Sequence, residues 1–217
     1  MRRAPGGAPL RGSDLEGAEI RWFVAPIPPD LLGRRWLFDL DGTLTVAMHD
    51  FAALKRALGL PAERPVLEGI AERPVAERSS LLDRVARWEW EHAARAEAAV
   101  GAHELLSRLA GPVGIVTRNR RDVALRTLAA TGLDRWFRDE HVLGRDEAPP
   151  KPAPDGLLRL LDSWGVAPEH AVFIGDHGLD VAAGRAAGVV TVHLTRGPPA
   201  PRAHHVVGCL SELLPTT

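Results

Sequence analysis

Residues 36–45 read WLFDLDGTLT, an apolar run that opens into a loop with two acids. The apolar residues 36–38 are aromatic-rich and are followed by Gly42, which is typical of a buried strand entering a turn. Side chains two apart in extended backbone point the same way, so Asp39 and Asp41 can converge on one site. A plain acidic turn would explain Asp41 and Gly42, but it gives no reason for Asp39 directly behind an apolar strand.

Short apolar runs of the same kind recur along the chain and alternate with helical patterns. The further predicted strands are 113–116, 171–174 and 189–194, with weaker ones at 141–143 and 206–207. Apolar residues at three- and four-residue spacing predict helices over 121–130, 155–164 and 178–187. This alternation predicts an α/β, Rossmann-like fold in which helices flank a parallel sheet, and ligands bind beyond the carboxyl ends of its strands.

One segment, 46–110, breaks the alternation. It contains no convincing strand pattern and is rich in Ala, Glu, Arg and Leu, which predicts helices. Asp50 can cap a helix that ends at Leu58, and 75–99 is predicted as one long helix or two. We therefore expect a small helical cap inserted into the α/β core. The predicted division is a flexible tail at 1–19, a core made of 20–45 and 111–217, and the cap at 46–110.

The bulk composition excludes several classes of partner. With 27 basic and 28 acidic residues, the chain has no net field to gather nucleic acid or anionic lipid. No stretch approaches the roughly 20 apolar residues that span a bilayer. The single cysteine, Cys209, can form no internal disulfide, which favours a packing role and a reducing cytoplasm. We expect a cytoplasmic protein, monomer or homodimer, with no nucleic-acid or membrane partner.

Polar residues follow two further predicted strands, and one lies within a proline-rich loop. Thr117 ends the second strand, where its hydroxyl and adjacent backbone N–H groups can hold an oxygen atom of an anion. Asp176 and Asp180 follow the fourth strand, although a helix cap is the simpler role for Asp176 or Thr117 alone. Lys151 lies in PPKPAP, where prolines restrict the backbone, whereas most isolated lysines are solvated.

Taken together, these motifs resemble those of the haloacid dehalogenase superfamily, in its phosphatase branch. Residues 39–45 resemble the first motif, Thr117 the second, Lys151 the third and 175–180 the fourth, in the expected order. The resemblance covers 36–194. It implies the fold of that superfamily and a phosphoglycolate phosphatase-like enzyme that hydrolyses a small phosphorylated metabolite. The implied reaction is Mg²⁺-dependent cleavage of a phosphate monoester through an aspartyl-phosphate intermediate.

The resemblance also implies a role for each site residue. Asp39 is the expected nucleophile, and Asp41 is the expected general acid and base. His177 stands where many members of the family carry a small polar residue, so we expect loop exposure rather than metal binding. The expected phosphate-binding residues are Gly42, Thr117, Arg118 and Lys151, with Asn119 binding the substrate. The expected magnesium ligands are Asp39, Asp41 through its backbone carbonyl, Asp176 and, as an outer or occasional ligand, Asp180.

Other functions stay open at this point. A dehalogenase of this superfamily lacks the second acid of the first motif, so the presence of Asp41 argues against dehalogenase activity. A phosphomutase of the same fold keeps both acids and is only weakly disfavoured. A non-catalytic binding module would be expected to have lost a catalytic residue, and none is lost.

The cap residues that contact the substrate are also left open, because charged residues on a helix are mostly solvated. The candidates are Arg73, Arg78, Arg84, Arg87 and His49.

Overall fold

The structure is a computed structural model that describes residues 29–46, 51–200 and 202–214. The predicted tail at 1–19 lies outside these ranges, as do His49 and Asp50. Within the described ranges, no helix combines the length and apolar character that passage through a membrane requires.

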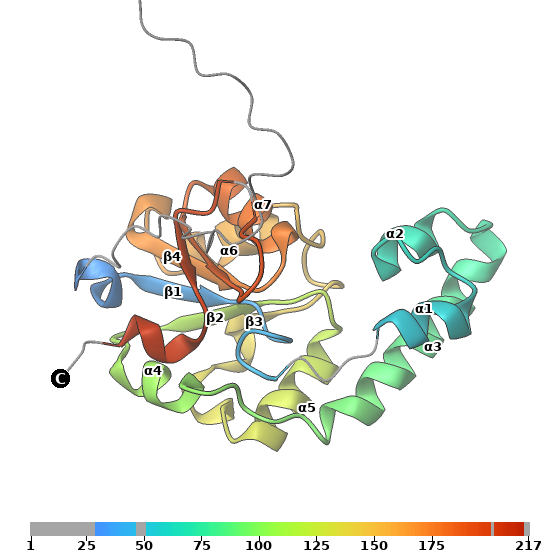
Figure 1. Cartoon of the computed structure of the whole chain (residues 1–217), viewed down its shortest axis with the longest axis horizontal. Helices are drawn as coiled ribbons and strands as arrows, with labels where there is room; N and C mark the ends of the chain where they lie inside the picture. The colour runs from blue at the N-terminus through green and yellow to red at the C-terminus, as the bar shows by residue number, and fades with distance from the viewer. Residues whose placement is uncertain (1–28, 47–50, 201, 215–217) are drawn as a thin grey trace, which may run out of the picture.

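One parallel sheet of six strands forms the centre of the molecule, in the order β3-β2-β1-β4-β5-β6 (Figure 1). All six predicted strands are present: β1 Arg35–Phe38, β2 Val113–Val116, β3 Val142–Leu143, β4 Ala171–Gly175, β5 Val190–Leu194 and β6 His205–Val207. Phe38 of β1 is in register with both Ile115 and Ile174. The carboxyl ends of β1, β2 and β4 therefore meet at the middle of one sheet edge, where a ligand site is expected.

Helices cover both faces of the sheet because successive side chains of a strand point to opposite sides. The covering helices are α4 Ala102–Arg108, α5 Arg121–Thr131, α6 Asp155–Ser163 and α7 Gly178–Ala187. Trp36 and Phe38 pack with α4 and α5, whereas Leu37 packs with α6 and α7. Figure 1 shows α6 and α7 above the sheet and α4 and α5 below it. The predicted α/β fold is confirmed.

Short 3-10 helices occupy several connections and both ends of the described chain. They are η1 Pro29–Gly33, η2 Asp134–Trp136, η3 Asp139–His141, η4 Pro168–His170 and η5 Leu210–Leu213. The last of these, η5, places Leu210 and Leu213 in the same apolar cluster as Trp36 and Phe38. It therefore helps α4 and α5 to cover that face of the sheet.

A separate lobe of helices lies beside the sheet (Figure 1). It consists of α1 Phe51–Leu58, α2 Val66–Ala71 and α3 Val75–Ala93. These helices share their own apolar cluster, which includes Leu54, Ile70 and Val85. By contrast, α4 places Leu105 and Leu106 in the cluster on the sheet. The boundary between cap and core at residue 110 stays a prediction.

The helix predicted over 75–99 is wrong for its last residues, because α3 ends at Ala93. Backbone pairing with the chain after β1 replaces the helix there. The N–H group of Ala99 donates to the carbonyl of Leu44 at 2.8 Å. The two connections between the sheet and the helical lobe therefore lie side by side.

Candidate active site

The loop after β1 brings Asp39 and Asp41 to the sheet edge. The backbone N–H of Asp39 donates to the carbonyl of Ile174 in β4 at 2.9 Å. Gly42 then turns the chain with a φ of +77°. A Cβ atom at Gly42 would lie 2.3 Å from Oδ2 of Asp176, closer than any side chain tolerates. Glycine is required here both by the left-handed backbone and by the approach to Asp176.

Lys151 lies inside the site, with 2% of its side chain exposed. Its Nζ is 2.5 Å from Oδ1 of Asp39 and 2.6 Å from Oδ1 of Asp180. A lysine is buried this deeply only where carboxylates compensate its charge. Although burial alone would lower it, the neighbouring carboxylates of Asp180 and Asp39 raise the pKa of Lys151 above its ordinary value. The structure thus brings a charged Lys151 to Asp39.

Three carboxylates, those of Asp39, Asp176 and Asp180, each offer an oxygen atom within 4.8 Å of the others. Burial raises the pKa of Asp39 well above its ordinary value; Lys151 opposes this rise, while the charges of Asp180 and Asp176 add to it. Burial and the charge of Asp180 also raise the pKa of Asp176. One lysine does not balance three carboxylates, so these three groups could hold a further cation.

Asp180 is tied to protein groups through both of its oxygens. Oδ1 contacts Lys151, and Oδ2 accepts a hydrogen bond of 2.9 Å from the backbone N–H of His177. The exposed His177 is the N-cap of α7, and its Nδ1 accepts a hydrogen bond from the N–H of Leu179. This reciprocal arrangement is a capping box. Asp180 therefore fixes both Lys151 and the start of α7, and the expected loop exposure of His177 is confirmed.

The loop with Asp176 has a further support that sequence reasoning missed. His193 of β5 is 5% exposed, and its Nε2 lies 3.0 Å from the backbone carbonyl of Asp176. Its Nδ1 accepts a hydrogen bond of 2.9 Å from the N–H of Ala200. Because Nδ1 accepts, Nε2 carries the proton and donates to Asp176. No local pattern distinguishes His193 from other histidines in the sequence.

Thr117 and Asn119 lie at the end of β2, next to Asp41. Thr117 is 3% exposed, and its Oγ1 accepts a hydrogen bond from the backbone N–H of Asn119 at 3.2 Å. The side-chain amide of Asn119 donates to Oδ2 of Asp41 at 2.6 Å. The structure therefore brings both predicted residues into the site, and Asn119 contacts the predicted acid and base directly.

Arg118 reaches across the site from the same loop. One guanidinium nitrogen donates to the backbone carbonyl of Lys151. Another lies 2.5 Å from Oε2 of Glu68 in α2. Arg118 therefore connects the loop after β2 both to the lysine loop and to the helical lobe.

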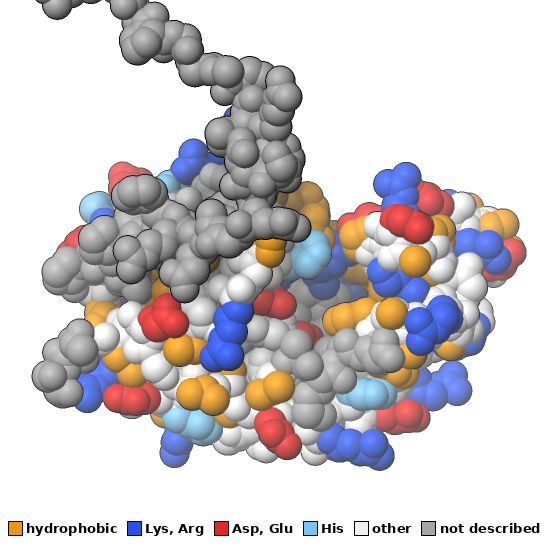
Figure 2. All heavy atoms as spheres, in the orientation of Figure 1, with side chains coloured by type: hydrophobic (Ala, Val, Ile, Leu, Met, Phe, Trp, Pro, Cys, Tyr) orange, Lys and Arg blue, Asp and Glu red, His pale blue; other side chains and the backbone are white. Residues whose placement is uncertain are grey.

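The predicted site residues line a cavity of about 470 Å³ between the sheet edge and the helical lobe. Figure 2 shows the molecule hollowed at this position. The lobe contributes the apolar side chains of Phe51, Leu54 and Val85 to the wall. Its charged side chains at the cavity are Lys55, Glu63, Arg64 and Glu89. The cap arginines considered from sequence are not among the described residues that line it: Arg73, Arg78, Arg84 and Arg87.

Comparison with known proteins places this site in a family context. A family model described as haloacid dehalogenase-like hydrolase matches residues 83–188. A phosphoglycolate phosphatase of Rhodospirillum rubrum is 33% identical over 192 residues, which cover 74% of this chain and 79% of that protein. A phosphoglycolate phosphatase of Escherichia coli O157:H7 is 31% identical over 167 residues, which cover 73% of this chain and 62% of that protein. The chain thus spans less than two thirds of the length of the Escherichia coli relative.

Similarity of fold extends to solved structures. The crystal structure of a predicted phosphoglycolate phosphatase from Haemophilus somnus 129PT matches with a TM-score of 0.67 and 21% sequence identity. The match covers 83% of this chain and 96% of that structure. At 21% identity, this match supports similarity of fold alone.

Proposed function

The chain belongs to the haloacid dehalogenase-like hydrolases, and we propose that it is a Mg²⁺-dependent phosphatase acting through an aspartyl-phosphate on Asp39. The observation that carries the proposal is the burial of Lys151 between Asp39 and Asp180 at a cavity. This arrangement joins a nucleophilic carboxylate to a fixed positive charge for phosphoryl oxygens. The similarity to phosphoglycolate phosphatases supports the same class of reaction.

The acidic cluster fits a hard divalent cation. The carboxylates of Asp39 and Asp176, with the backbone carbonyl of Asp41, would hold Mg²⁺, and Asp180 lies beside them. When bound, the cation neutralises charge on the phosphate, which otherwise repels an anionic nucleophile. Burial, with a smaller effect of the neighbouring carboxylates, raises the pKa values of Asp39 and Asp176, and a bound cation would offset both effects.

In the first half-reaction, the carboxylate of Asp39 attacks the phosphorus atom. The bond from phosphorus to the leaving oxygen breaks, and Asp41 in its acid form donates a proton to that oxygen. In the second half-reaction, Asp41 takes a proton from water, whose oxygen attacks phosphorus and releases Asp39 and phosphate. The hydrogen bond from Asn119 supports this role by fixing one oxygen of Asp41.

The proposed contacts of the phosphoryl oxygens are Lys151, Thr117 and the backbone N–H groups near Gly42 and Arg118. Lys151 supplies a charge, and Thr117 supplies a hydroxyl at the end of β2. Groups held this rigidly stabilise the transition state without having to reorganise first.

Asp39→Asn tests the proposal. The variant should release no phosphate from an aryl phosphate in the presence of Mg²⁺, because an amide is not a nucleophile for this step. Asp162→Asn, the same change at an exposed position, should keep wild-type turnover. Near-wild-type phosphate release by Asp39→Asn would refute the assignment. Mass spectrometry of acid-quenched wild-type protein should detect the added phosphate on Asp39.

Two alternatives have distinct readouts. A phosphomutase keeps the same residues, and it would convert a sugar phosphate into an isomer rather than into free phosphate. A non-catalytic binding module would show no Mg²⁺-dependent hydrolysis of an aryl phosphate, and removal of the metal with EDTA would change nothing.

The proposed substrate is a small phosphorylated metabolite, since the cavity opens at the sheet edge beneath the helical lobe. A panel of phosphorylated acids, sugars and aryl phosphates, each assayed for phosphate release, would identify the leaving group.

We further propose a cytoplasmic monomer or homodimer without nucleic-acid or membrane partners. Light scattering of the purified protein would decide between the two oligomeric states.

A further inference from the structure

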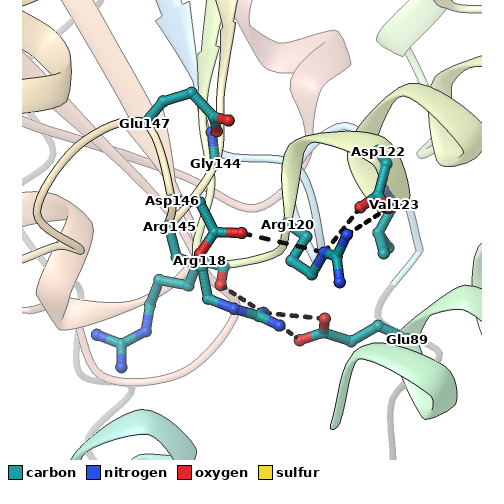
Figure 3. Close-up of polar contacts among 9 residues, drawn as sticks. All are labelled: Glu89, Arg118, Arg120, Asp122, Val123, Gly144, Arg145, Asp146 and Glu147. Atoms are coloured by element: carbon teal, nitrogen blue, oxygen red, sulfur yellow. Dashed lines mark hydrogen bonds and ion pairs between the residues drawn. The ribbon is translucent and has the colours of Figure 1, made fainter. Parts of the chain in front are cut away.

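A buried ion pair joins the helical lobe to the loop after β3 (Figure 3). One guanidinium nitrogen of Arg145 lies 2.9 Å from each carboxylate oxygen of Glu89 in α3. The side chains are 7% and 5% exposed, respectively. Exposed ion pairs contribute little to stability, but each partner of a buried pair is costly when the other is lost. The Glu89–Arg145 pair therefore strongly restrains α3 relative to this loop.

The position of Glu89 in its helix is unusual for a charged residue. The buried positions of α3 recur every four residues, at Leu81, Val85, Glu89 and Ala93. This spacing marks the face of a helix that packs against its neighbours. An acid on that face has to find a buried cation, and Arg145 is that cation. Glu89 also lines the cavity that contains Asp39.

Arg145 in turn holds the loop that follows β2. The nitrogen that contacts Glu89 also donates to the backbone carbonyl of Arg118 at 3.1 Å. The backbone N–H of Arg145 donates to the carbonyl of Asn119 at 2.9 Å. At Gly144, an added Cβ atom would lie 2.6 Å from that same carbonyl, so the two loops can meet only because residue 144 is glycine. Arg145 thus fixes the two peptide groups that flank Asn119.

The restrained loop carries groups of the proposed reaction. Asn119 donates to Oδ2 of Asp41, and its backbone N–H donates to Oγ1 of Thr117. A continuous series of contacts therefore runs from Glu89 in the helical lobe, through Arg145, to the proposed acid and base.

We propose that Glu89 and Arg145 are positioning residues that align Asn119 with Asp41, and that the placement of the helical lobe is thereby coupled to proton transfer. This inference rests on the proposed phosphatase function. Neither side chain touches the reacting atoms; both act through the loop that contains Thr117 and Asn119. The partly exposed contact between Arg118 and Glu68 in α2 ties the same loop to the lobe a second time.

The test combines one single variant with one paired variant. Glu89→Gln keeps the shape of the side chain but removes its charge. Glu89→Met with Arg145→Met removes both charges together, a change that buried ion pairs often tolerate without unfolding. Glu91→Gln is the matched control, because Glu91 is an exposed acid of the same helix. Circular dichroism establishes which variants are folded, and an aryl phosphate with Mg²⁺ serves as the substrate.

In the folded variants of the pair, kcat should fall about ten- to a hundredfold, because small misplacements of catalytic groups reduce rates by such factors. KM should change much less, since the pair is proposed to act through the loop that contains Asn119, and Glu91→Gln should behave as wild type. Hydrogen exchange of amides 118–121 should become faster in the variants. If Glu89→Gln unfolds, the paired variant decides the outcome alone.

Two results would overturn the inference: a folded paired variant with wild-type kcat, or a change in KM with no change in kcat. A merely structural pair would lower the melting temperature and leave kcat intact. Wild-type protein that releases no phosphate would instead refute the proposed function. In that case the exchange rates still decide whether the pair restrains the loop, and unchanged rates would overturn the inference.

Discussion

The side-chain amide of Asn119 donates a hydrogen bond of 2.6 Å to the carboxylate of Asp41, although the two residues are 78 positions apart in the chain. This contact joins the loop after β2 to the loop after β1. It fixes the orientation of Asp41 for its proposed work as acid and base, which depends on geometry as much as on acidity.

Removal of the amide of Asn119 should therefore weaken catalysis. We expect Asn119→Ala to lower kcat by about tenfold or more, because Asp41 loses the group that orients it. The melting temperature should fall only slightly, since the loop keeps its backbone contact with Arg145. Steady-state kinetics and thermal unfolding would check both points. Unchanged kcat in a folded Asn119→Ala protein would contradict this role.

Loss of the charge at Lys151 should be more severe. Lys151→Met should lower kcat by roughly a hundred- to a thousandfold, because a buried group that stabilises transition-state charge is removed. The variant also leaves Asp39 and Asp180 without their shared cation. Phosphate release measured over a range of Mg²⁺ concentrations would check the rate and would show whether added metal restores it. Activity within tenfold of wild type would argue against the assignment of Lys151.

Gly42→Ala should abolish Mg²⁺-dependent activity, because the added methyl group would meet the carboxylate of Asp176. Gly59→Ala is the matched control: Gly59 also has positive φ, at +65°, but an added Cβ would meet no atom within 4 Å. Both variants should lose about 1–2 kcal/mol of stability from the left-handed backbone. Only Gly42→Ala should lose phosphate release, and equal losses in both variants would contradict this reasoning.

The buried acid at position 39 predicts a pH dependence of stability. The pKa of Asp39 in the folded protein lies above its ordinary value of 3.8. Between these two pKa values the folded state binds more protons than the unfolded chain, so this group's contribution to the free energy of unfolding falls as pH rises. In metal-free buffer, Asp39→Asn should therefore be more stable than wild type at neutral pH.

The same reasoning sets the controls for that experiment. The advantage of Asp39→Asn should shrink as the pH is lowered and should vanish only well below 3.8, where Asp39 is protonated in both states. Added Mg²⁺ should stabilise wild type more than the variant, because Asp39 is a proposed ligand. Urea unfolding across this pH range, with and without metal, would measure both effects. A wild-type protein that is more stable than Asp39→Asn in EDTA at neutral pH would contradict the raised pKa.

Much of the fold and the outline of the site follow from local sequence patterns. The strand at 113–116 was predicted to the residue, because a four-residue apolar run between charged or turn-forming neighbours has few other structures open to it. The positions of Asp39, Thr117 and Asp176 follow from the same pattern, because parallel strands end at a common edge. The resemblance of these motifs to a known family then indicated the chemistry.

The sequence of α3 contains local signals that do not decide where the helix ends or which residue Glu89 contacts. Residues 75–99 are predicted as one long helix or two, since their composition favours helix throughout. The helix that begins at Val75 ends at Ala93 instead, because residues near Ala99 pair with the chain after β1. Glu89 occupies an apolar row of that helix, which is a detectable signal of a buried partner, but the pattern does not identify the partner.

The sequence by itself determined which residues enter strands and helices and which polar groups leave the carboxyl ends of the sheet, because periodicity and turn chemistry act over a few neighbouring residues. Only the tertiary structure decided that Asn119 meets Asp41, that Glu89 meets Arg145 and that His193 supports the loop of Asp176. These contacts join distant parts of the chain, and a buried polar group pairs with whatever partner the packed elements bring within reach.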